Sequence, residues 1–138
     1  MIRGVLVETG FLLALNPRDK HHKWALNILE DARKGLISLY LSTPAILELA
    51  LILKSRGISD RDIALLLESM NIVIRSYTRL NYAQVTLDSA ILALELRHRY
   101  PNLTFFDSHH ASLAITYNLE YIDLDSIVQE VVVKELKG

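Results

Sequence analysis

Short apolar runs of strand character alternate with longer segments of helical periodicity, and this alternation constrains the fold more than any other feature of the chain. The strand-like runs occupy residues 2–7, 36–41, 71–75, 119–122 and 131–134. Apolar residues recur at helical spacing within residues 21–34, 45–55, 63–70, 80–94 and 107–117. Strands separated by helices require right-handed crossovers and pair in parallel. We therefore expect an α/β fold in which helices cover both faces of a mainly parallel sheet.

The length and composition fit one folded domain. The chain has 138 residues, which suit a single domain spanning 1–138, and its 51% of apolar residues excludes a disordered protein. No window approaches the roughly 18 consecutive apolar residues that a membrane helix needs. The first residues lack the charged region and cleavage site of a signal peptide, and the chain contains no cysteine. We therefore expect a cytoplasmic protein with no membrane association.

The overall charge gives little attraction for nucleic acid. Fifteen basic and 16 acidic residues leave a net charge of −1. A protein that holds nucleic acid by charge alone is usually basic overall. An RNA substrate would therefore need a local basic rim or bound cations.

Several carboxylates stand where the local pattern calls for apolar side chains. Glu8 directly follows the apolar end of the first strand, and Glu48 lies in a helix that is apolar almost all round. Asp107 opens a helix after an apolar segment, and Asp123 and Asp125 follow the fourth strand. Carboxylates are seldom buried without a partner, because removing an isolated charge from water is costly.

The order of the elements brings most of these acids to one edge of the predicted sheet. Open α/β sheets bind their ligands beyond the carboxyl ends of the strands. Carboxylates that meet there repel one another and raise one another's pKa values unless a cation neutralises them. Hard cations prefer oxygen ligands, so Mg²⁺ or Mn²⁺ suits such a site. The pattern therefore predicts metal-assisted hydrolysis of phosphodiester bonds.

Each acid also has a structural interpretation. Asp107 can cap its helix, Asp123 and Asp125 can be ordinary loop acids, and Glu8 can form a structural salt bridge. Glu48 is the hardest to explain structurally, because its helix offers no obvious polar face.

Four segments of the chain, in order and in register, resemble the motifs of the PIN-domain family. They read VLVETGFLLAL (residues 5–15), STPAILELA (42–50), FDSHHASLA (106–114) and YIDLD (121–125). Within the last segment Asp125 best matches the family's terminal acid, and Asp123 matches the hydroxyl position before it. The resemblance covers essentially the whole chain.

The resemblance implies a five-stranded parallel sheet of order 3-2-1-4-5 and a ribonuclease activity that depends on Mg²⁺ or Mn²⁺. It implies an endoribonuclease acting on single-stranded RNA, often as a homodimer, and often as the toxin of a toxin–antitoxin pair that an antitoxin protein inhibits. The implied catalytic residues and metal ligands are Glu8, Glu48, Asp107 and Asp125, with Asp123 as a further candidate ligand. Thr9 and His110 would support them, although a packed histidine is the alternative for His110.

Two alternatives stay open. The family normally has aspartate at the position of Glu8, and the extra methylene disturbs the near-octahedral geometry that Mg²⁺ demands. The chain could therefore be a catalytically weakened PIN-like domain that binds RNA or protein. A phosphoacceptor receiver domain also collects acids at strand ends and carries a lysine near its last strand, as Lys134 would be. Receivers place paired acids after the first strand, whereas this chain has one.

Overall fold

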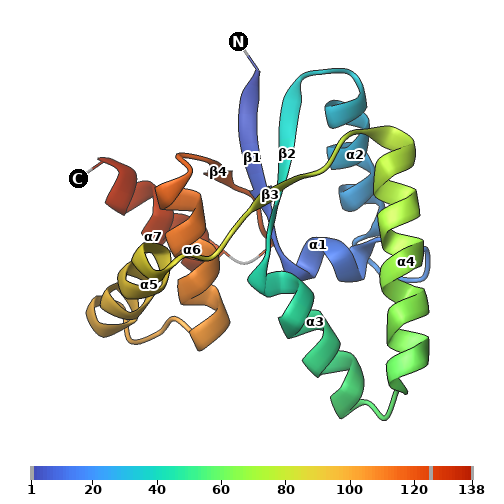
Figure 1. Cartoon of the computed structure of the whole chain (residues 1–138). Coiled ribbons are helices and arrows are strands. Elements are labelled where there is room, and N and C mark those ends of the chain that lie inside the picture. The colour runs from blue at the N-terminus through green and yellow to red at the C-terminus, as the bar shows by residue number, and fades with distance from the viewer. Residues whose placement is uncertain (1, 125, 138) are drawn as a thin grey trace.

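A parallel sheet forms the centre of the protein in the computed structural model, which describes residues 2–124 and 126–137. The strand order is β3-β2-β1-β4, and every pairing is parallel (Figure 1). The strands are β1 (Arg3–Val7), β2 (Ile37–Ser42), β3 (Asn81–Ala83) and β4 (Glu120–Tyr121). The fold class predicted from the alternating elements is confirmed.

Helices cover the two faces of the sheet, with α1–α4 on one side and α5–α7 on the other (Figure 1). They are α1 (Thr9–Ala14), α2 (His22–Arg33), α3 (Pro44–Ser55), α4 (Asp60–Tyr77), α5 (Leu87–Arg99), α6 (Phe105–Thr116) and α7 (Ser126–Lys137). Two hydrophobic cores follow from this layering, one on each face. The central strand shows why: Val5 and Val7 enter the first core, and Leu6 between them enters the second.

The third strand lies later in the chain than the sequence predicts. Residues 71–75 were expected to form a strand but continue α4, and the strand follows at Asn81–Ala83. Ile63 and Ile74 are buried on the inner face of α4, with Leu67 and Met70 packed against the same core. Packing of this helix face against the core stabilises the helix more than the intrinsic strand preference of the β-branched residues opposes it. The helix predicted from residue 80 accordingly starts at Leu87.

The fifth predicted strand, at residues 131–134, is also helical. It belongs to α7, where Val128, Val131 and Val132 are buried at the i, i+3, i+4 spacing of one helix face. The sheet therefore has four strands in the described residues rather than five, and these keep the predicted order 3-2-1-4.

Candidate metal centre

Glu8 is positioned by the end of β1 and the start of α1. Its backbone is extended (φ −134°, ψ −157°), so it continues the alternation of the strand and faces the same side as Leu6. It is also the N-cap of α1, since its Oε1 accepts a hydrogen bond of 2.7 Å from the Gly10 N–H. One carboxylate oxygen is thus held by the backbone, and Glu8 as a whole is 8% exposed.

Glu48 is held by two side chains from other elements. It lies in α3, which begins directly after β2 with Pro44 in its first turn. Its Oε1 accepts hydrogen bonds from the Thr9 hydroxyl and, at 2.9 Å, from His110 Nε2. Within the part of the chain that the structure describes, the second oxygen, Oε2, forms no hydrogen bond. That oxygen is available to a ligand.

His110 links three elements through its two ring nitrogens. The fully buried ring lies on α6, with Nδ1 at 2.6 Å from the Ser42 hydroxyl and Nε2 at the Glu48 carboxylate. A carboxylate only accepts hydrogen bonds, so we assign the proton to Nε2, and Nδ1 then accepts from Ser42. The chain Ser42–His110–Glu48 fixes the orientation of the acid.

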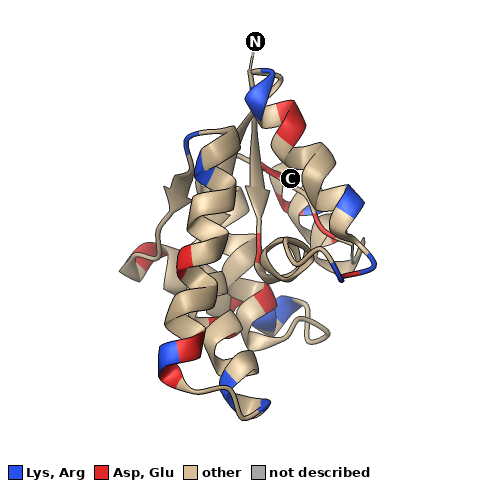
Figure 2. Cartoon of the chain, turned by 90° about the vertical axis from the view of Figure 1, so that its right-hand side faces the viewer, with Lys and Arg blue, Asp and Glu red and all other residues tan. Residues whose placement is uncertain are grey.

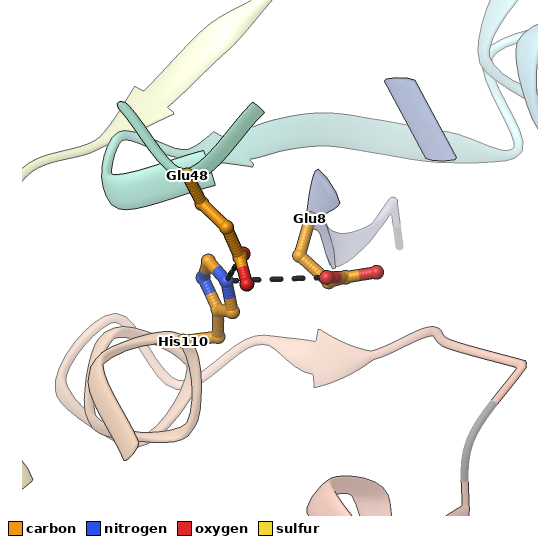
Figure 3. Close-up of side chains that lie close together, drawn as sticks. All are labelled: Glu8, Glu48 and His110. Carbon is orange, nitrogen blue, oxygen red and sulfur yellow. Dashed lines mark hydrogen bonds and ion pairs between the residues drawn. The ribbon is translucent and has the colours of Figure 1, made fainter. Parts of the chain in front are cut away.

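These side chains converge on one point (Figure 3). The ligand atoms of Glu8, Glu48 and His110 all lie within 4.8 Å of one another. The second carboxylate oxygen of Glu8, Oε2, lies 3.9 Å from His110 Nε2. The residues come from β1–α1, α3 and α6, so the tertiary fold creates the cluster at the carboxyl edge of the sheet.

The remaining predicted site residues stand at different distances from this cluster. Asp123 lies beside Glu8, whose protonated carboxyl donates a hydrogen bond to the Asp123 side chain. Asp107 is half-buried in the first turn of α6, one turn before His110, and stands outside the three-residue group. Asp125 lies outside the described residues. The suggestion that Asp107 caps its helix is wrong, because Thr104 is the N-cap and accepts from the Asp107 N–H.

The two glutamates titrate differently. Burial, followed by the charge of Asp123, raises the pKa of Glu8 to about 8, although the Gly10 hydrogen bond acts in the opposite direction. Burial also raises the pKa of Glu48, but the hydrogen bonds from His110 and Thr9 outweigh it and leave that pKa below its usual value. At neutral pH the metal-free cluster therefore holds a proton on Glu8 and a charge on Glu48.

The residues of the cluster fit a hard divalent cation. No lysine or arginine forms an ion pair with Glu8, Glu48 or Asp107 in the described ranges, so their charge is not neutralised by the protein. Glu48 is tethered through Oε1, which leaves its Oε2 for a ligand, and the backbone tethers Glu8 through its own Oε1. The donor set is rich in oxygen, as Mg²⁺ and Mn²⁺ require.

We expect the metal-free protein to lose stability as the pH rises from about 5 to about 8. A carboxyl group with a raised pKa binds more protons in the folded than in the unfolded state, so its contribution is full below the ordinary pKa and is lost through the raised value. Thermal unfolding at several pH values, with and without Mn²⁺, measures this. Glu8→Gln should flatten the metal-free profile. An unchanged slope in that variant would show that another group causes it.

Sequence reasoning assigned no role to Ser42. The residue ends β2 and contacts His110 across 68 positions of sequence, so no local pattern signals the pair. Its complete burial beside the helix that carries Glu48 becomes visible only in the folded chain.

A parallel sheet with unneutralised carboxylates at its carboxyl edge defines an α/β protein with an acidic site suited to a metal. The sequence model of the PIN domain family matches residues 5–134, and the chain therefore belongs to the PIN domain family. The structure resembles that of the VapC20 toxin of Mycobacterium tuberculosis, a toxin described as cleaving the sarcin-ricin loop. The two share 20% sequence identity at a TM-score of 0.64, with 91% of this chain and 93% of the toxin covered.

A search of curated proteins finds no significant sequence match. Within the described residues, no helix is long and apolar enough to cross a membrane.

Proposed function

We propose that this protein is an endoribonuclease that hydrolyses phosphodiester bonds of single-stranded RNA with the help of Mg²⁺ or Mn²⁺. The observation that carries the proposal is the convergence of Glu8 and Glu48, without a lysine or arginine partner among the described residues, at the edge of a PIN-family sheet. Carboxylates held close together in a partly buried site favour a cation, because it removes the repulsion that otherwise keeps a proton on one of them.

The residues of the cluster have distinct roles in this proposal. Glu8 and Glu48 would hold the ion through their Oε2 atoms, with Asp107, Asp123 and Asp125 adding charge and further ligands. A bound divalent ion polarises a phosphate oxygen and makes a water molecule more acidic. Thr9 and His110 orient Glu48, and the Gly10 N–H orients Glu8. The protein thus supplies an arrangement of oxygen ligands that is fixed before the ion arrives.

The distribution of charge supports a substrate held through the metal. Lysine and arginine are interspersed with aspartate and glutamate on the side shown in Figure 2, and the net charge is −1. Such a surface gives little general attraction for a polyanion. We propose that RNA phosphates bind mainly through the cation, with nearby basic side chains in support.

Exposed apolar side chains on two helices support the proposal that this protein binds protein partners. Leu47 and Leu51 on α3 are 66% and 57% exposed, and Leu87 and Ile91 on α5 are 85% and 56% exposed. Grouped apolar residues on a surface often mark protein contacts. Together with the likeness to VapC20, they support a homodimer that acts in the cytoplasm as the toxin of a toxin–antitoxin pair.

A cleavage assay with fluorogenic single-stranded RNA of mixed sequence tests the activity. We expect cleavage with Mn²⁺ or Mg²⁺, none with a chelator, and a loss of more than about 100-fold in Asp107→Asn, because the ion loses a carboxylate. Asp88→Asn, an exposed acid in the first turn of α5, is the matched control and should retain activity.

Equal Mn²⁺ affinity of the wild type and Asp107→Asn in isothermal titration would remove Asp107 from the site. A wild type that binds Mn²⁺ without cleaving RNA, and gains cleavage in Glu8→Asp, would favour the weakened alternative.

A further inference from the structure

The hydroxyl group of Tyr121 is buried without a hydrogen-bond partner. Tyr121 ends β4 and is 2% exposed, and its Oη forms no hydrogen bond in the described parts of the chain. Buried tyrosine hydroxyls usually find a partner, because an unpaired polar group is costly in an apolar surrounding. Phenylalanine would fill the same space without that cost. The hydroxyl therefore calls for a partner that the described residues do not supply.

Strand geometry directs Tyr121 toward the acidic cluster. Tyr121 pairs with Leu6 on β1, and both side chains enter the core beneath α5–α7. Alternation along the strands then places Glu8 and Asp123, each two residues further on, over the same face. Burial is the largest cause that raises the pKa of Tyr121. The charges of nearby carboxylates raise it further, in the order Glu8, Asp123, Asp107 and Glu48. Oη is thus within electrostatic reach of every described carboxylate of the site.

A protonated hydroxyl beside carboxylates is a hydrogen-bond donor. Among the residues that the structure describes, no carboxylate oxygen forms a direct hydrogen bond with Oη. A water molecule can bridge such a gap when it has two to four polar partners, and the hydroxyl and the neighbouring acids supply them.

We propose that Tyr121 is a positioning residue of the metal centre, whose hydroxyl donates a hydrogen bond to a water molecule that is shared with Glu8 and Asp123. The water would hold the two carboxylates in the arrangement that binds the divalent ion. The inference rests on the proposed function, because it assigns Tyr121 a role in the same site. It assigns no contact between Tyr121 and the RNA.

Tyr121→Phe tests the proposal, and Tyr40→Phe is the matched control. Tyr40 pairs with Leu6 from the other side and packs against the same core. Its ring leans toward the amino end of the sheet, 3.8 Å from a Cβ built on Gly4, and contacts the Tyr117 ring at 6.3 Å between centroids. The control thus removes a hydroxyl from the same layer but away from the acids.

Isothermal titration with Mn²⁺ should show an affinity about 10-fold lower in Tyr121→Phe, the usual effect of losing a group that orients metal ligands, and no change in Tyr40→Phe. The melting temperature of metal-free Tyr121→Phe should be unchanged or higher, because no hydrogen bond to another described residue is lost. Wild-type Mn²⁺ affinity in Tyr121→Phe, or a clearly lower melting temperature without metal, would overturn the proposal.

A crystal structure of the wild type with Mn²⁺ tests the same point without any variant. We expect a water molecule within hydrogen-bond distance of Oη, and an Oη without one would refute the assignment. A wild type that fails to bind Mn²⁺ would overturn the proposed function, and this inference with it. Equal affinities of the wild type and Tyr121→Phe would overturn the inference alone.

Discussion

Replacing Glu48 by glutamine is expected to reduce Mn²⁺-dependent RNA cleavage by more than about 100-fold while leaving the fold intact. The reason is that the two carboxylate oxygens of Glu48 have different partners. Oε1 accepts the hydrogen bonds from Thr9 and His110, and a glutamine oxygen can accept both. The amide NH₂ would then replace Oε2, the atom available to the ion. The variant thus removes a charge and a ligand but keeps the contacts that hold the side chain.

Three measurements separate the effect on the site from an effect on the fold. Thermal unfolding should be close to the wild type, Mn²⁺ titration should show weak binding, and the RNA assay should show little cleavage. Glu68→Gln, an exposed acid on α4, is the control for the loss of one negative charge. Full activity in Glu48→Gln would exclude Glu48 from the catalytic cluster.

His110→Ala is expected to lower the free energy of unfolding by about 2–4 kcal/mol, because the buried Ser42 and the half-buried Glu48 lose their hydrogen bonds and a cavity remains. The imidazole is fully buried between Ser42 and Glu48. Its removal also frees Glu48, so the affinity for Mn²⁺ should fall by about 10-fold. Chemical denaturation measures the first effect and titration the second.

The comparison with His110→Gln tests whether the ring positions Glu48 or binds the metal itself. A glutamine amide can still donate to Glu48, so a positioning role predicts partial recovery of the Mn²⁺ affinity. His109→Ala is the control, since that ring packs on Phe105 at 4.7 Å between centroids and has no contact with Glu48. If His110→Gln bound Mn²⁺ no better than His110→Ala, the positioning role would be wrong.

The fold could be predicted from the sequence wherever periodicity and packing agree. The apolar run that becomes β1 is buried on both faces, and α2 shows a regular apolar stripe from Ala25 to Ala32. The errors fall on residues 71–75 and 131–134, where runs of β-branched residues resemble strands. In both segments only one helix face is buried: Ile74 lies on it in the first, and Val131 and Val132 lie on it in the second, whereas Ile72 and Val133 are exposed. This pattern becomes decisive only once the opposing surface is known.

The candidate site could be predicted in part. Glu8 and Glu48 stood out because they interrupt apolar segments, and the fold brings them together. The motif favoured Asp125 as the terminal acid and left Asp123 as a further candidate, and the position of Asp123 beside Glu8 became visible only in the folded chain. The hydrogen bonds of Ser42 and His110, and the unpaired hydroxyl of Tyr121, depend on side-chain directions across elements far apart in sequence.

In the proposed metal site, Glu8 would couple the short helix α1 to the binding of the ion. The same carboxylate that faces His110 also closes the first turn of α1 through Gly10. A Cβ atom at position 10 would lie 2.7 Å from Oε1, so even a methyl group there would push the carboxylate aside. If the ion binds through Glu8 as we propose, its binding and the order of this turn would be linked in both directions. The rate of hydrogen exchange at the Gly10 amide becomes a local reporter of whether a cation is bound.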